Sequence, residues 1–79
     1  MDEQKIKQDV SIGDNIRKIR KKQNIKQVEL VQLLQLQGID MTRETLVKIE
    51  GGRQHIKASQ LRGIRNALKT TYDELLADQ

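Results

Sequence analysis

The feature that most limits the possible folds is a series of short segments in which Ile, Leu and Val recur with helical spacing. Ile12, Ile16 and Ile19 fall at i, i+4 and i+7, on one face of a helix over about residues 12–22. The chain contains no proline, and no segment alternates apolar and polar residues as a half-buried strand would. These patterns predict an all-α protein.

Four further short helices follow along the chain. The apolar spacing places them at about residues 27–36, 43–50, 59–68 and 71–76. At 79 residues and without cysteine, the chain must hold one small bundle together with aliphatic side chains alone. The expected core residues are Ile12, Ile16, Ile19, Val28, Leu34, Leu46, Ile49, Leu61, Ile64, Leu68, Leu75 and Leu76.

Polar residues at the segment ends predict the helix boundaries. The expected N-caps are Ser11, Thr42, Ser59 and Thr71. Two of them, Ser11 and Thr71, are followed three positions later by an acidic residue, Asp14 and Glu74 respectively, which is the spacing of a capping box. Asn24 and the Gly51–Gly52 pair are expected to end helices in the left-handed conformation. Residues 1–10 are expected to be a flexible N-terminal arm, and residues 11–79 the domain.

Positive charge is concentrated in two segments. Residues 12–26 carry six basic residues and one acidic residue, and residues 42–57 carry four basic and two acidic residues. The rest of the chain is neutral or negative. Two basic segments on one small domain suit a polyanionic partner, although a solvated charged surface gives the same pattern.

The sequence offers little that could organise catalysis. It has one histidine, His55, no cysteine, and no phosphate-cradling glycine loop. We therefore expect no enzyme activity, no catalytic residues, no cofactor and no metal site. No apolar run approaches membrane-spanning length and no signal-peptide pattern opens the chain, so a cytoplasmic protein without a membrane partner is expected.

Residues 12–76 resemble the Cro and phage-repressor (XRE-type) helix-turn-helix family. The similarity lies in four features in this order: the Ile-Arg repeat of IGDNIRKIRKK, Gln27 opening the second helix, Glu followed by Gly at the end of TRETLVKIEGGR, and the Ala-Leu pair before the capped YDELL. The resemblance implies a compact five-helix lambda-repressor-like domain. Its second and third helices would form the helix-turn-helix, and the third would enter the DNA major groove.

The resemblance also implies roles for individual residues of the third helix. Arg43 would bind guanine, Glu44 would accept from cytosine, and Val47 would touch a thymine methyl. Lys48 would reach guanine or a phosphate. The expected contacts to the DNA backbone are Lys26, Gln27, Thr42, Thr45, Arg53, His55 and Lys57.

A charge pair between Arg20 and Glu50 is implied by the same family pattern. It would link the first helix to the end of the third, where an unpaired carboxylate would be costly. Three departures stand against the family pattern. The segment 35–41 is longer than the usual turn, so we expect either an extended second helix or a wider turn. Val31 replaces a small residue. Lys69 stands where a glycine is usual, so this helix end is expected to close by other means, on Thr70 and Thr71.

The expected function is that of a sequence-specific regulator of transcription, a repressor, bound to double-stranded DNA. A domain of this size contacts few base pairs, so we expect a homodimer on a palindromic operator. The same fold could instead serve as an antitoxin or adaptor module that binds a protein partner. The two alternatives differ in salt dependence, because binding to DNA through Lys and Arg weakens steeply as salt rises.

Overall fold

The structure is a computed structural model that describes residues 11–78. This part of the chain contains five α-helices and no strand, so the prediction of an all-α protein is confirmed. The helices are α1 (Ile12–Lys22), α2 (Gln27–Leu36), α3 (Arg43–Glu50), α4 (Ala58–Leu68) and α5 (Tyr72–Leu75). The predicted flexible arm, residues 1–10, lies outside the described residues.

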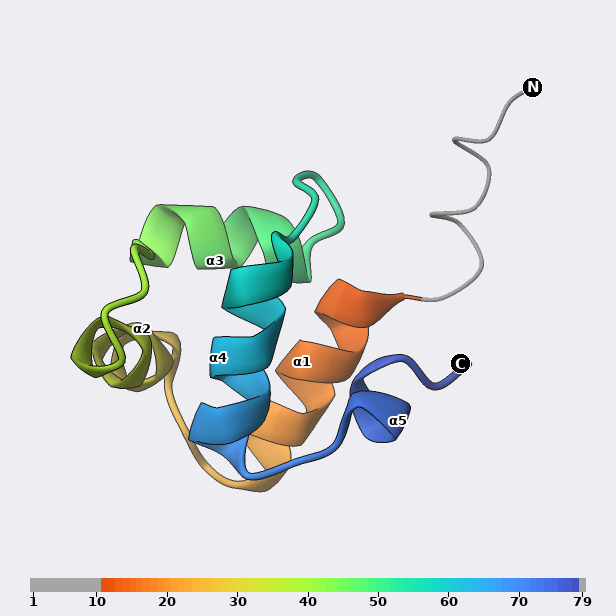
Figure 1. The fold of residues 1–79 in the computed structure, drawn as a ribbon. Helices are drawn as coiled ribbons and strands as arrows, with labels where there is room; N and C mark the ends of the chain where they lie inside the picture. Colours follow the sequence, from red (N-terminus) through yellow and green to blue (C-terminus); the bar gives the residue numbers. More distant parts are fainter. Residues whose placement is uncertain (1–10, 79) are drawn as a thin grey trace.

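The helices pack around α1 and α4 (Figure 1). α1 contacts α3, α4 and α5, and α2 contacts α3 and α4. α3 lies along one side of the molecule, at the top in Figure 1. The loop between α3 and α4 projects above both helices in this view. α5 lies beside α1, away from α3. Within residues 11–78, no other helix covers one long side of α3.

The core is aliphatic, as predicted, apart from one methionine. Its buried members come from all five helices and from the connection between α2 and α3. They are Ile16, Leu30, Val31, Leu34, Met41, Leu46, Ile49, Ile64, Leu68 and Leu75. Ile12, Ile19 and Leu61 pack against this core but remain partly exposed. Leu76 was predicted to be buried, which is wrong: it is 41% exposed, because α5 ends at Leu75 and the chain turns outward.

The residues that α2 buries differ from the core residues predicted for this helix. Leu30, Val31 and Leu34 are buried and lie within about a third of the helix circumference. Val28 projects well away from the centre of this arc and is 48% exposed, so its predicted core position is wrong. Leu33 lies on the opposite edge of the arc and is also exposed. The error arose because the six apolar residues on this short helix fit two overlapping stripes.

Two of the four predicted N-caps are confirmed. The Thr42 hydroxyl accepts a hydrogen bond from the Thr45 N–H at 3.1 Å, and the Thr71 hydroxyl accepts one from the Glu74 N–H at 3.1 Å. Ser11 precedes α1 but makes no capping hydrogen bond through its side chain. Ser59 lies inside α4, which begins one residue earlier, so its predicted capping role is wrong.

Each of the helices α1 to α4 is followed by a residue in the left-handed conformation, which after α2 is Gly38 with φ 79°. Asn24 adopts φ 59° after α1, and Gly52 adopts φ 75° after α3, as predicted. After α4 this conformation falls on Lys69 itself, with φ 53°, rather than on the following threonines. The Thr70 N–H then closes onto the Arg65 carbonyl at 3.1 Å. A side chain at a position that favours glycine is a local source of strain.

The connection between α2 and α3 is wide, which is one of the two possibilities that the long segment 35–41 allowed. α2 ends at Leu36, and the chain needs six residues to reach the first residue of α3. This connection is not a loose loop. Met41 is 2% exposed within the core, and Ile39 packs against it. The segment therefore adds to the hydrophobic core as well as joining two helices.

The C-terminal segment is held on α1 and α4. The Asn15 side-chain amide donates to the Leu75 carbonyl at 2.8 Å and to the Ala77 carbonyl at 2.9 Å. The Arg65 guanidinium lies 4.9 Å from the centre of the Tyr72 ring. Among residues 11–78, no helix has the length and apolar character needed to cross a membrane.

Candidate nucleic-acid interface

The free side of α3 carries a row of charged side chains. Arg43, Glu44 and Lys48 are exposed, and Val47 is partly exposed between them. The opposite side of the helix is buried through Leu46, Ile49 and Glu50. α3 is thus a short helix fixed along one face, and its other face presents two cations and one carboxylate to solvent.

Both ends of α3 are closed by hydrogen bonds. At the start, the Thr42 side chain caps the Thr45 N–H and its hydroxyl also lies 3.0 Å from that of Thr45. At the end, the Gly52 N–H bonds to the Ile49 carbonyl and the Arg53 N–H to the Lys48 carbonyl, at 3.1 and 2.8 Å. A helix of eight residues is too short to be stable alone. These caps and the packing beneath supply the missing stability.

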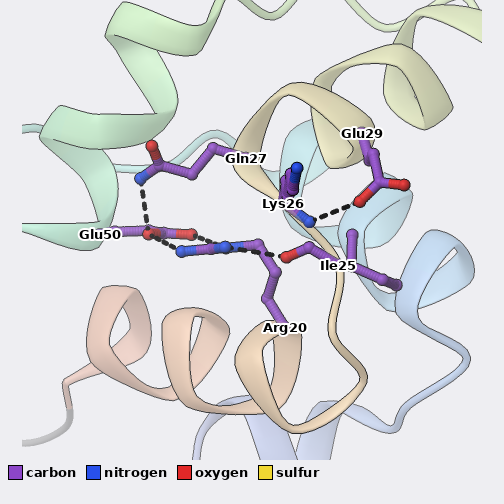
Figure 2. A network of polar contacts seen from close by, with 6 residues as sticks. All are labelled: Arg20, Ile25, Lys26, Gln27, Glu29 and Glu50. Carbon is purple, nitrogen blue, oxygen red and sulfur yellow. Dashed lines mark hydrogen bonds and ion pairs between the residues drawn. The ribbon is translucent and has the colours of Figure 1, made fainter.

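A buried ion pair joins α1 to the end of α3 (Figure 2). Arg20 Nε donates to Glu50 Oε2 at 2.8 Å, and Arg20 Nη2 donates to Glu50 Oε1 at 2.9 Å. The two side chains are 7% and 3% exposed. Arg20 Nη1 also donates to the Ile25 carbonyl at 2.9 Å, in the loop before α2. The structure therefore contains the pair that the family pattern implied.

Glu50 accepts a third hydrogen bond, from a second partner that the sequence did not predict. Gln27 Nε2 donates to Glu50 Oε1 at 3.0 Å, so the first residue of α2 is tied to the last residue of α3 (Figure 2). Gln27 lies at the centre of the inward arc of α2, on the same face of the helix as Val31 and Leu34. A polar residue at such a position is the signal that could have predicted an internal partner. In this arrangement its amide nitrogen faces the protein interior.

The region at the start of α2 combines one cation with a helix N-terminus. The Lys26 side chain is exposed, and its backbone N–H donates to Glu29 Oε1 at 2.7 Å (Figure 2). Glu29 thereby satisfies the first backbone donor of the helix. The Lys26 ammonium stays at the surface, next to the positive end of the helix dipole.

The loop after α3 supplies further basic side chains. The side chains of Arg53, His55 and Lys57 are all exposed, while Ile56 between them packs against the core. Because Ile56 packs against the core, it holds the middle of the loop that carries these three polar residues on the domain. The loop begins directly at the end of α3, and its charges therefore continue the charged row of that helix.

A close contact between α1 and α3 was also missed from the sequence. A Cβ atom added at Gly13 would lie 2.0 Å from the Ile49 carbonyl oxygen and 3.0 Å from the Glu50 Cα. The absence of a side chain at Gly13 lets the backbone of α3 approach α1 directly. A glycine one residue into a predicted helix is the only trace that this contact leaves in the sequence.

Within residues 11–78, no three His, Cys, Asp or Glu side chains gather as metal ligands would. The expected absence of a cofactor stays a prediction. In comparisons with protein-family models, with curated proteins and with solved structures, nothing matches the chain.

Proposed function

We propose that this protein is a sequence-specific DNA-binding regulator of transcription, a repressor with the helix-turn-helix arrangement of the Cro and phage-repressor family. α2 and α3 would form the helix-turn-helix, and α3 would lie in the major groove. The observation that carries the proposal is the exposed row of Arg43, Glu44 and Lys48 on a helix whose opposite face is buried. An α-helix fits the major groove of B-DNA, and these side chains match the donors and acceptors of base edges.

Each exposed residue of α3 has a base that suits its chemistry. Arg43 can donate two hydrogen bonds to O6 and N7 of guanine, and Glu44 can accept from N4 of cytosine. Val47 lies between the charged side chains and can contact a thymine methyl group. Lys48, near the end of the helix, can reach a guanine or a phosphate. Because Arg43 and Glu44 are at the start of the helix, they would contact the bases first.

The surrounding polar residues would hold the sugar-phosphate backbone. Lys26 directly precedes α2, Arg53, His55 and Lys57 lie in the loop after α3, and all four side chains are exposed. Gln27 would approach a phosphate with its backbone N–H, since its side-chain nitrogen is bonded to Glu50. Thr42 and Thr45 serve as the cap of α3 and would add contacts from their hydroxyl groups. Such contacts set register and contribute affinity without reading sequence.

A regulator of this size would bind as a homodimer on a palindromic operator. A single copy of α3 covers only a few base pairs, and two copies one helical turn apart would give the specificity that a genome requires. The same chemistry requires no cofactor or effector.

The test combines selection with a salt titration. Random duplexes bound by the purified full chain are selected and sequenced. The affinities for the selected duplex and for a scrambled duplex are then measured over a range of salt concentrations. We expect a two-fold symmetric sequence and a log-log slope of about −0.9 for each phosphate that a Lys or Arg neutralises. Failure to enrich any sequence, or an affinity that does not change with salt, would contradict the proposal.

A protein partner is the second candidate function. Val28, Leu33 and Leu36 are exposed on the outer side of α2, and Leu36 is 84% exposed. Apolar side chains gathered on one helix mark surfaces that bind other proteins. An antitoxin or adaptor would use this surface. It is favoured if the protein shows no salt-dependent affinity for any duplex.

A further inference from the structure

The wide connection between α2 and α3 rests on a gap in the surface of α4. A Cβ atom added at Gly63 would lie 2.1 Å from Ile39 Cδ1 and 2.9 Å from Leu34 Cδ2. The end of the Ile39 side chain thus occupies the space that any larger residue at position 63 would need. Gly63 is itself buried in the middle of α4. Its missing side chain forms a socket for the connection.

Hydrogen bonds fix the rest of the connection on both sides of this socket. Gln37 Nε2 donates to the Gly63 carbonyl at 2.9 Å, and the Gln37 side-chain oxygen accepts from Asn66 Nδ2 at 3.3 Å. Gln35 Nε2 donates to the Met41 carbonyl at 3.1 Å. Met41 is buried in the core directly before Thr42, the cap of α3. The anchored connection therefore ends at the first turn of α3.

α3 is consequently held at two separated points. Its C-terminal end lies against α1, through the Gly13 contact and the Arg20–Glu50 pair. Its N-terminal end follows the connection that is seated on α4. A helix fixed at one end can pivot, whereas one fixed at both ends has a defined direction. α3 is about 12 Å long, so a shift of about 1 Å at its start would tilt it by roughly 5°.

Such a shift would matter for contacts to bases. The N–H···O distances of good hydrogen bonds span only about 2.7–3.2 Å. Two bonds from one guanidinium to one guanine require correct distance and correct orientation together. Contacts to phosphates by flexible Lys and Arg side chains tolerate small displacements much better. The two classes of contact therefore depend differently on the direction of α3.

We infer that Ile39 and Gly63 are positioning residues for base selectivity. Their contact sets the direction in which α3 presents Arg43 and Glu44, while affinity for DNA of any sequence does not depend on it. This inference rests on the proposed function, since it concerns the selectivity of that interface. Neither residue would touch DNA, because Gly63 is buried and Ile39 is turned toward α4.

Three variants of the full chain test the inference. Gly63→Ala displaces the end of Ile39, and Ile39→Ala removes the anchor without adding an atom elsewhere. In Ile39→Val/Gly63→Ala the missing Cδ1 removes the 2.1 Å contact and leaves Cγ1 at an ordinary 3.5 Å, so only the end of the Leu34 side chain, Cδ2 at 2.9 Å, must shift to admit the new methyl group. Each variant is first checked for helical content and thermal unfolding, and Ile39→Ala carries the test if Gly63→Ala does not fold.

The measured quantity is the ratio of affinities for the selected duplex and for the scrambled duplex. We expect this ratio to fall by about tenfold or more in Gly63→Ala and Ile39→Ala, with affinity for the scrambled duplex within about threefold of the parent. The double variant should recover most of the ratio. A folded single variant that keeps the parent ratio would overturn the inference, as would a fall that the double variant does not reverse. If the parent protein itself selects no duplex, the proposed function fails instead.

Discussion

Arg20 and Glu50 face each other with two parallel hydrogen bonds in a site that is almost closed to water. The Glu50 carboxylate also accepts from Gln27, so one side chain joins α1, the start of α2 and the end of α3. Removing one partner of a buried ion pair leaves the other charge unpaired in a poorly solvated position. The pair thus makes one carboxylate a shared anchor for the C-terminal end of α3.

Replacement of Glu50 by alanine should strongly destabilise the domain. We expect Glu50→Ala to lower the free energy of unfolding by about 3–5 kcal/mol, since Arg20 is left buried without its partner. Urea denaturation at low temperature measures the loss. Glu44→Ala, on the exposed side of the same helix, is the matched control and should change stability by less than about 0.5 kcal/mol. In a cycle with Arg20→Ala, strictly additive losses would show that the two charges do not stabilise each other.

Gly13 should not tolerate even the smallest side chain. In most helices a Gly to Ala change stabilises by about 0.5–1 kcal/mol. Here the added methyl group would meet the backbone oxygen of Ile49, which cannot rotate away, so we expect Gly13→Ala to destabilise by about 1–3 kcal/mol or more. Ser59→Ala, at an exposed position inside α4, serves as the control and should be close to neutral. An increase in the melting temperature of Gly13→Ala would show that the backbones of α1 and α3 are farther apart.

Lys69 should be replaceable by glycine with a gain in stability. Its left-handed conformation costs an L-residue about 1–2 kcal/mol, part of which is offset by the greater freedom of glycine in the unfolded chain. We expect Lys69→Gly to raise the melting temperature by roughly 4–8 °C, the shift that corresponds to about 1 kcal/mol in a domain of this size. Arg62→Gly, inside the same helix, should lower it. Calorimetry that finds both variants destabilised would rule out the left-handed end of α4.

Arg43 and Arg53 should differ in what they contribute to DNA binding. Loss of Arg43 should cost about 1–3 kcal/mol at one base pair of the selected site and leave the other positions unchanged. Loss of Arg53 should weaken binding to all duplexes alike and reduce the salt slope by about one. Both alanine variants are measured against the selected duplex and its single-base variants. Equal losses of Arg43→Ala on every duplex would place this side chain on a phosphate.

Much of the helical framework could be predicted from the sequence. Apolar residues at i, i+3 and i+4, the capping threonines and Asn24 depend on neighbours within one helical turn, and the structure contains them where the pattern indicates. The prediction failed where a residue had several local choices. Val28 fits two apolar stripes equally well, and the direction of the core decides between them. Ser59 could cap a helix, but α4 begins before it because Lys57 and Gln60 close the first turn instead.

The contacts that place α3 were harder to predict. Gln27 and Glu50 are 23 residues apart, and Ile39 and Gly63 are 24 apart, so no periodicity within one helix relates them. The Arg20–Glu50 pair was anticipated only through the family resemblance. Exposure of Arg43, Glu44 and Lys48 followed from the helical spacing, whereas their proposed contacts to bases await the binding experiments.

The Arg65–Tyr72 contact also makes Tyr72 an intrinsic spectroscopic probe of the C-terminal helix. Tyr72 is its only aromatic fluorophore, because the chain has no tryptophan and no second tyrosine. The phenol lies beside a guanidinium of the preceding helix, so its ultraviolet emission and circular dichroism change when α5 separates from α4. Detachment of the C-terminal helix can therefore be followed without a label.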